Sequence, residues 1–234
     1  MQIQTVGIIG AGTMGNGIAQ ACATSGINVV MVDISEAAVQ KGLATVAGSL
    51  DRLIKKEKIS AADKEAALAK ITVSTDYSAL KAAQLVIEAA TENEALKIKI
   101  LQEVDALVGP EVLIASNTSS ISITKLAAVT GRADKFIGMH FFNPVPMMAL
   151  VEVIRGLQTS DATHAAVQAL AQQLGKTPIT VKNGPGFVVN RVLIPMINEA
   201  FFVLAEGLAT AEDIDAGMKL GCNHPIGPLA LADM

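Results

Sequence analysis

The sequence has few aromatic residues and no excess of positive charge. Aromatic residues make up 3% of its 234 positions, and the formal net charge is −4. Nucleic-acid binding calls for a basic surface and for aromatic rings on which bases stack, so we expect no nucleic-acid partner. The one dense basic run is Lys55, Lys56 and Lys58, and the other Lys and Arg residues are mostly scattered.

Cysteines are also scarce, and long apolar runs are missing. Cys22 and Cys222 lie far apart in sequence, with no Cys-x-x-Cys or Cys/His spacing that would indicate zinc. We expect both to be small buried residues in a reducing compartment. Residues 1–5 carry no positive charge, and no apolar run is long enough to span a bilayer. These features predict a soluble cytoplasmic protein with no metal site and no membrane partner.

Short β-branched runs alternate with segments of helical spacing along most of the chain. Strands are expected at residues 5–9, 27–32, 71–74, 85–88, 112–115, 135–139, 150–154 and 178–181. Helices are expected at residues 13–25, 35–58, 60–70, 95–108, 121–129 and 161–174. Ser60 and Asp63 have the spacing of an N-cap pair. This alternation predicts βαβ units and a parallel sheet in a Rossmann-type, doubly wound α/β fold.

A Gly-Pro-Gly run at residues 184–186 marks the predicted domain boundary. Residues 1–184 form the predicted α/β domain, and residues 185–234 are the predicted start of a mostly helical second domain. Residues 187–204 are apolar on nearly every helical face. A helix of this kind cannot face water alone, so we expect it to be buried against further helices and a second subunit.

The segment GAGTMG at residues 10–15 directly follows the first expected strand and opens a helix. Gly10 permits a tight turn, Gly12 lets the backbone approach a pyrophosphate, and Gly15 lets helix and strand pack closely. The phosphates would bind at the positive end of the helix. Asp33 ends the next strand, where a carboxylate accepts hydrogen bonds from both ribose hydroxyls and repels a 2′-phosphate. The sequence therefore predicts a domain that binds NAD.

Polar residues also accompany three strands further along the chain. Residues 116–120 (SNTSS) follow one strand, at the carboxyl edge where open α/β sheets bind ligands. His140 comes just past the end of another strand, and Glu152 is a single acid inside the apolar strand that follows. A buried carboxylate needs a partner, and an imidazole held by a carboxylate is a better general base. Adjacent strands bring their ends together, so we predict that the side chains of His140 and Glu152 meet there and form a catalytic pair.

Six motifs occur in order over the whole chain: GAGTMGNGIAQ, ASNTSS, HFFNPVP, LVEVI, GPGFVVNR and HPIGPLALAD. With these motifs the sequence resembles the NAD-dependent L-3-hydroxyacyl-CoA dehydrogenase family, most of all its bacterial short-chain members that act on 3-hydroxybutyryl-CoA. The resemblance implies reversible oxidation of a short (S)-3-hydroxyacyl-CoA to the 3-oxoacyl-CoA, with NAD accepting hydride.

The resemblance also implies roles for single positions. His140 matches the catalytic base, Glu152 its partner acid, and Ser119 and Asn190 match residues that touch the substrate. Ser49 and Lys56 match residues that meet the coenzyme A moiety. The cofactor-binding set expected from the motif and the resemblance together is Gly10, Gly12, Met14, Gly15, Asp33, Glu92, Lys97, Asn117 and Asn143.

At the level of the whole protein, the resemblance implies a homodimer through the C-terminal domain, and further helices after the position of Met234. Two alternatives stay open. A related dehydrogenase of a free hydroxy acid or sugar acid would not need the Ser49 and Lys56 contacts. A non-catalytic NAD-binding protein would not need the full set of His140, Glu152, Ser119 and Asn190.

Overall fold

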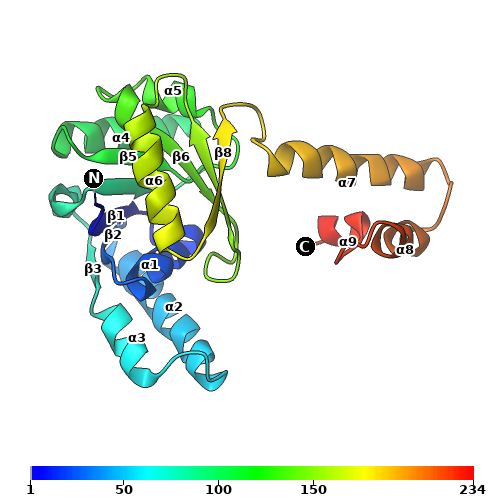
Figure 1. Ribbon diagram of the computed structural model, residues 1–234, viewed down its shortest axis with the longest axis horizontal. Coiled ribbons are helices and arrows are strands. Elements are labelled where there is room, and N and C mark those ends of the chain that lie inside the picture. The colour runs from blue at the N-terminus through cyan, green and yellow to red at the C-terminus, as the bar shows by residue number, and fades with distance from the viewer. Residues whose placement is uncertain (1) are drawn as a thin grey trace. The chain divides into compact units, whose positions relative to one another are not determined.

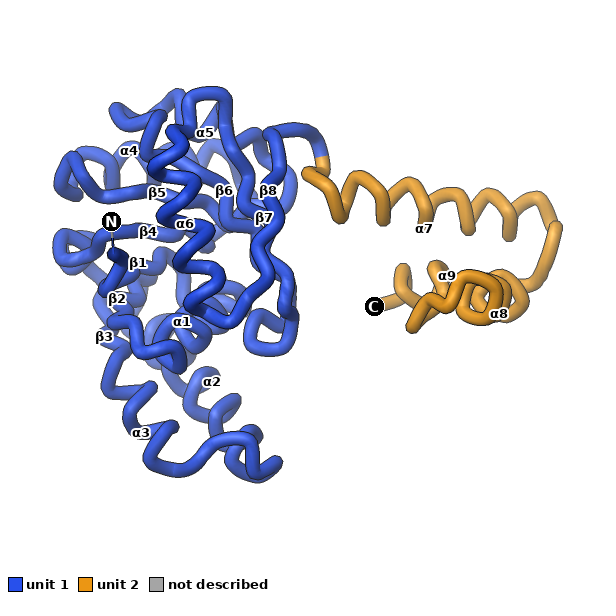
Figure 2. Tube along the Cα trace, viewed as in Figure 1, with its two compact units in different colours: residues 1–185 blue, residues 186–234 orange. Residues whose placement is uncertain are grey.

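The computed structural model describes residues 2–234, and the chain divides into two compact units. Unit 1 is residues 1–185 and unit 2 is residues 186–234 (Figure 2). No helix within residues 2–234 combines the length and the apolar character that a membrane span requires.

Within the described residues, unit 1 is built on one eight-stranded sheet (Figure 1). Its strands are β1 (Thr5–Ile9), β2 (Asn28–Val32), β3 (Ile71–Ser74), β4 (Leu85–Glu88), β5 (Leu113–Ser116), β6 (Phe136–Phe141), β7 (Leu150–Arg155) and β8 (Thr177–Lys182). The order across the sheet is β3-β2-β1-β4-β5-β6-β7-β8. The order changes direction between β1 and β4, which creates the crevice where doubly wound folds bind ligands. The predicted α/β fold class is confirmed.

The helices of unit 1 are α1 (Thr13–Thr24), α2 (Glu36–Lys55), α3 (Ala61–Leu68), α4 (Glu94–Leu107), α5 (Ile123–Ala127) and α6 (Asp161–Gln173). Two short 3-10 helices, η1 (Tyr77–Ala82) and η2 (Ala133–Lys135), were not predicted. Several helices begin at a side chain that accepts a backbone N–H and so satisfies an otherwise unpaired donor. Ser35 does this for α2 and Asn93 for α4, and Ser60 with Asp63 forms the predicted capping box of α3.

Helices cover both faces of the sheet. Residues of α1, α2, α3 and α6 share one hydrophobic cluster with strand residues such as Ile137 and Met139 of β6. Gly138 lies between these two and, because side chains alternate along a strand, faces the other side. A Cβ built on Gly138 would lie 2.9 Å from Ile123 of α5. Burial of apolar side chains on both faces of the sheet thus fixes the positions of the strand ends.

The expected parallel sheet is wrong at one strand pair, because β6 and β7 run antiparallel. Residues 142–149 join these strands without a helix. A parallel pair needs a crossover of a dozen or more residues, whereas a connection this short returns the chain alongside its own strand. Strand β6 also continues to Phe141, so His140 lies inside the strand and not past its end.

Helices α2 and α5 differ in length from the prediction, and Cys222 differs in burial. Helix α2 ends at Lys55, with Lys56 as its C-cap, because the backbone of Glu57 turns to a positive φ of 54°. Helix α5 covers only Ile123–Ala127 of the predicted 121–129. Cys22 is buried as expected, but Cys222 is exposed.

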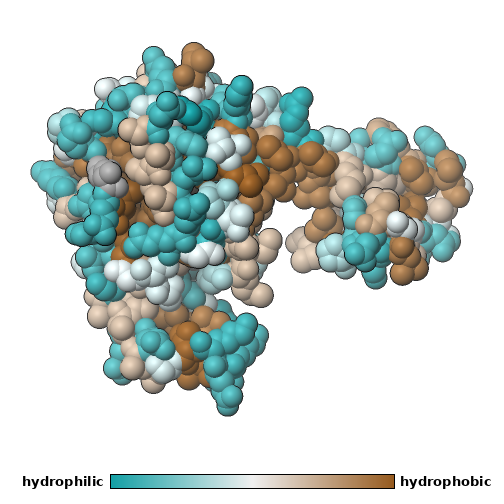
Figure 3. Space-filling model, in the orientation of Figure 1, coloured by the Kyte–Doolittle hydropathy of each residue, from teal (hydrophilic) through white to brown (hydrophobic). Residues whose placement is uncertain are grey.

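Unit 2 is helical, with α7 (Val189–Ala205), α8 (Ala211–Gly221) and α9 (Pro228–Ala232). Large apolar side chains of α7 are exposed: Val192 at 66%, Ile194 at 59%, Phe201 at 49% and Phe202 at 54%. Hydrophobic residues are accordingly visible over the surface of this helix (Figure 3).

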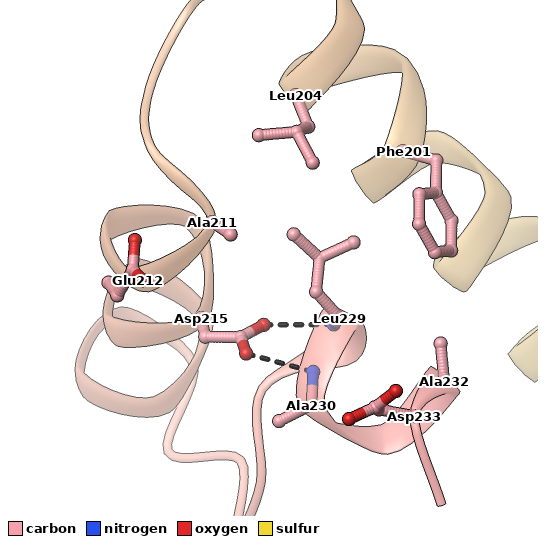
Figure 4. A pocket seen from close by; sticks show the side chains of 9 residues that line it. All are labelled: Phe201, Leu204, Ala211, Glu212, Asp215, Leu229, Ala230, Ala232 and Asp233. Atoms are coloured by element: carbon pink, nitrogen blue, oxygen red, sulfur yellow. Dashed lines mark hydrogen bonds between the residues drawn. The ribbon is translucent and has the colours of Figure 1, made fainter.

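A hollow of about 390 Å³ lies among the three helices of unit 2. Phe201 and Leu204 of α7 and Leu229 of α9 contribute its apolar side (Figure 4). Asp215 of α8 accepts hydrogen bonds from the backbone N–H groups of Leu229 and Ala230, both at 2.9 Å. This carboxylate satisfies the first donors of α9 and ties α9 to α8.

Candidate active site

The glycine-rich turn between β1 and α1 has the backbone geometry that the motif predicts. Gly10 has a φ of +100°, and a Cβ there would lie 2.7 Å from the carbonyl oxygen of Ala89. A Cβ at Gly15 would lie 1.8 Å from the carbonyl oxygen of Gly10, so only glycine allows this approach of α1 to the turn. A Cβ at Gly12 would meet nothing within 4 Å, and no side chain caps the start of α1. Open space beside uncapped N–H groups is where a phosphate binds.

Two hollows meet at this turn. The first, of about 310 Å³, is lined by Ala11, Gly12, Thr13, Asn16, Asp33, Ala38, Lys41 and Thr45. The second, of about 250 Å³, is lined by Gly12, Thr13, Met14, Ala89, Ala90, Thr91, Glu92, Lys97 and Asn117. Because Gly12 and Thr13 belong to both, the two hollows adjoin at the N-terminus of α1.

Asp33 lies in the first hollow, directly after β2. Its Oδ2 accepts a hydrogen bond from the Ala11 N–H at 2.7 Å, and its Oδ1 accepts one from the Ile34 N–H at 2.7 Å. These bonds fix the carboxylate next to the glycine-rich turn, and each oxygen keeps a further lone pair for a ribose hydroxyl.

The chain's residues fit an NAD molecule laid across both hollows. Asp33 suits the adenosine ribose in the first hollow, and the N-terminus of α1 suits the pyrophosphate. The remaining half of the molecule, which carries the nicotinamide, would then lie in the second hollow. Met14, Glu92, Lys97 and Asn117 all line that second hollow, so the structure brings these four predicted cofactor residues together.

Side-chain hydrogen bonds connect the second hollow to the segment that carries Ser119. Glu92 accepts from the Thr118 hydroxyl at 2.7 Å and from the Ser119 N–H at 3.0 Å. Asn117 accepts from the Phe141 N–H at 2.9 Å, which ties the end of β5 to β6. The residues after β5 are thus held both to the wall of the hollow and to the strand that contains His140.

Lys97 is deeply buried although it lines the second hollow. Its side chain is 1% exposed and forms an ion pair with Glu88, which is 0% exposed and ends β4. Glu88 also accepts from the Ser116 hydroxyl at 2.9 Å. Glu88 is not among the predicted site residues. Its signal was available, because an acid that ends an apolar strand is the pattern that identified Asp33.

His140 and Glu152 lie directly opposite each other in the antiparallel pair of β6 and β7. His140 Nδ1 is 2.7 Å from Glu152 Oε2, and the two side chains are 8% and 0% exposed. The Phe142 ring lies 4.4 Å from the imidazole, centroid to centroid. The predicted contact is confirmed. Its expected origin is wrong, because antiparallel register, and not the meeting of two strand ends, brings the residues together.

The remaining predicted residues do not line either hollow. Asn143 is exposed just after β6. Ser49 lies on α2, and Lys56 is the exposed C-cap of that helix. The two residues are seven positions apart, which is about two turns, so both lie on one side of the helix. Asn190 lies in the first turn of α7, in unit 2.

Comparisons with known proteins cover the whole chain. Residues 5–184 match the family model described as 3-hydroxyacyl-CoA dehydrogenase, NAD binding domain. Residues 186–234 match the model described as 3-hydroxyacyl-CoA dehydrogenase, C-terminal domain.

Similar proteins carry related names. The solved structure of (S)-3-hydroxybutyryl-CoA dehydrogenase PaaH1 from Ralstonia eutropha is 78% identical, with a TM-score of 0.99, over 100% of this chain and 82% of its own. A 3-hydroxybutyryl-CoA dehydrogenase of Bradyrhizobium diazoefficiens is 49% identical over 99% of this chain and 79% of its length. A probable 3-hydroxybutyryl-CoA dehydrogenase of Bacillus subtilis is 48% identical over 100% and 81%.

Proposed function

Since the chain belongs to the 3-hydroxyacyl-CoA dehydrogenase family, we propose that it interconverts (S)-3-hydroxybutyryl-CoA and acetoacetyl-CoA with NAD(H). The observation that carries this proposal is the buried pair of His140 and Glu152. His140 lies on β6, which Asn117 ties to the wall of the second hollow, where we place the nicotinamide. A base at this place is next to the coenzyme half that exchanges hydride.

Oxidation of the hydroxyl removes a hydride from C3 and a proton from the oxygen. NAD, when bound, supplies the acceptor for the hydride. His140 Nδ1 is engaged by Glu152, so Nε2 is the ring nitrogen that takes the hydroxyl proton. The Glu152 carboxylate stabilises the imidazolium that results and fixes the orientation of the ring. In the reverse direction the same imidazolium returns the proton to the 3-oxygen.

Ser119 and Asn190 are assigned to the substrate's 3-oxygen in this proposal. The hydrogen bond from the Ser119 N–H to Glu92 supports the assignment of Ser119, because it fixes the backbone of Ser119 beside the second hollow. Ser49 and Lys56 are assigned to the coenzyme A moiety. The exposed position of Lys56 supports this, because a solvated ammonium is available to a phosphate.

Gly10, Gly12, Gly15 and Asp33 are proposed to hold the adenosine and pyrophosphate of NAD, with Met14, Glu92, Lys97, Asn117 and Asn143 along the nicotinamide half. A homodimer formed through unit 2 and a cytoplasmic location complete the proposal. The exposed apolar side chains of α7 support the dimer. The two free cysteines support a reducing compartment.

The test measures turnover of a panel of substrates by the change in NADH absorbance. Purified full-length protein should oxidise NADH with acetoacetyl-CoA and not with free acetoacetate. Turnover of free hydroxy acids or sugar acids instead would identify the related dehydrogenase. Tight NADH binding without turnover of any substrate would identify a non-catalytic protein. A Lys56→Ala variant should raise KM for acetoacetyl-CoA while kcat changes little, because Lys56 lies far from the reacting carbon in this assignment.

A further inference from the structure

Glu88 is a buried acid to which neither the glycine-rich motif nor the catalytic pair gives a role. One of its carboxylate oxygens pairs with the Lys97 ammonium and accepts from the Ser116 hydroxyl. The other accepts from the Ala90 N–H at 3.0 Å. The carboxylate therefore joins the end of β4 to the first turn of α4 and to the end of β5.

Stability alone is a weak reason for such a pair. Desolvation of two buried charges is costly, and apolar side chains of similar volume are often as stabilising. The position of the pair suggests a different reason. Lys97 and Ala90 line the second hollow, whereas Glu88 does not. Glu88 therefore holds two residues of the wall without lining the hollow itself.

The charges around this hollow matter because the coenzyme changes charge there. The nicotinamide ring is cationic in NAD⁺ and neutral in NADH. An ammonium at the wall repels the oxidised ring and leaves the reduced ring almost unaffected. The Glu88 carboxylate offsets the charge of Lys97, and Glu92 adds a negative charge to the same wall.

We propose that Glu88 is a positioning residue that sets the relative affinity of the site for NAD⁺ and NADH, by balancing the charge of Lys97 and holding Lys97 and Ala90 in the wall of the hollow. The inference rests on the coenzyme placement in the proposed function, and it does not depend on the identity of the substrate.

The test measures binding of both coenzyme forms to full-length protein without any substrate. NADH is titrated by its fluorescence, and NAD⁺ by displacement of NADH. Glu88→Gln should raise the ratio Kd(NAD⁺)/Kd(NADH) by about tenfold, as expected for one unbalanced charge near the ring at intermediate dielectric. Lys97→Met should lower the same ratio. The double variant should lie near the original protein.

The two single variants should change the Kd ratio in opposite directions, which structural damage would not do. Asp105→Asn is the matched control, because Asp105 pairs with Arg132 from the last turn of the same helix, with side chains only 18% and 10% exposed. This variant removes a carboxylate that is also largely buried and ion-paired, but at the end of α4 remote from Lys97. The ratio Kd(NAD⁺)/Kd(NADH) should therefore not change in Asp105→Asn.

An unchanged ratio in Glu88→Gln, or a shift in the same direction in both single variants, would overturn the proposal. If Glu88→Gln does not fold, the direction of the change in Lys97→Met and its reversal in the double variant decide the matter. Failure to turn over acetoacetyl-CoA would contradict the proposed function. The binding test would still be valid, because it uses no substrate.

Discussion

At the residue scale, the proposed chemistry depends on one contact. His140 and Glu152 meet at 2.7 Å in a buried position. His140→Gln keeps much of the side-chain shape but removes the base, so we expect turnover to fall roughly 10²–10⁴-fold with little change in NADH affinity. Glu152→Gln should also lower turnover, and the double variant should lose much less than both losses combined, because the pair acts as one unit.

The measurement is kcat with acetoacetyl-CoA, together with an NADH titration of each variant. Near-normal turnover in His140→Gln would show that His140 is only a core histidine. His164 offers a matched control, because it lies on α6 and its ring contacts the Thr180 hydroxyl at 2.9 Å. His164→Gln should leave turnover unchanged.

Asp33 should make the enzyme prefer NADH to NADPH. A 2′-phosphate would bring like charge against the Asp33 carboxylate, an effect on the order of a few kcal/mol. The preference is measured as the ratio of kcat/KM for the two coenzymes, and Asp33→Asn should reduce it. Equal efficiency of the original protein with both coenzymes would contradict the assignment.

The two thiols should differ in reactivity. Burial raises the pKa of the Cys22 thiol to about 12, whereas Cys222 is exposed. Because the thiolate is the reactive form, Cys22 stays protonated and unreactive at pH 8. A thiol reagent should therefore modify Cys222 and spare Cys22 in the folded chain, and should reach both after denaturation. Mass spectrometry of the labelled peptides identifies the site, and native labelling of Cys22 would argue against a tightly packed α1.

At the scale of single elements, the approach of α1 to the glycine-rich turn is the most constrained feature. A Cβ at Gly15 would lie 1.8 Å from a backbone oxygen, which cannot move away as a side chain can. Gly15→Ala should therefore displace α1, destabilise the protein by roughly 1–3 kcal/mol and weaken NADH binding.

Gly48→Ala is the control for this variant. Gly48 lies inside α2, and a Cβ there meets nothing within 4 Å. Alanine is the better helix former by roughly 0.5–1 kcal/mol, so this variant should be at least as stable as the original protein. Thermal unfolding and NADH titration of both variants give the comparison. Equal stability of the two would mean that α1 is not held at the observed distance.

At the scale of the whole molecule, the apolar surface of unit 2 needs a cover. Val192, Ile194 and Phe202 are each more than half exposed, which is costly in water. We expect full-length protein to be a dimer in light scattering. Ile194→Glu should weaken that dimer, because a charge would be buried in the interface. A monomeric original protein would contradict the prediction, and a dimer unaffected by Ile194→Glu would place the interface elsewhere.

Local patterns in the sequence determined much of the fold and of the coenzyme site. Strand β1, the start of α1, the capping box of α3 and the place of Asp33 could all be predicted, because each depends on residues close together in the chain. Glycine conformations and helix caps act over a few positions, so their signals survive without knowledge of the rest of the fold.

Only the tertiary structure decided how distant segments pair. The antiparallel register of β6 and β7 places His140 opposite Glu152. The ends of β4 and β5 bring the Ser116 hydroxyl to Glu88, and α4 brings Lys97 to the same carboxylate. Neither arrangement has a local signal. Strand direction follows from the length and course of the connection between two strands. A buried ion pair forms between charged groups that the packing of distant elements brings together and desolvates.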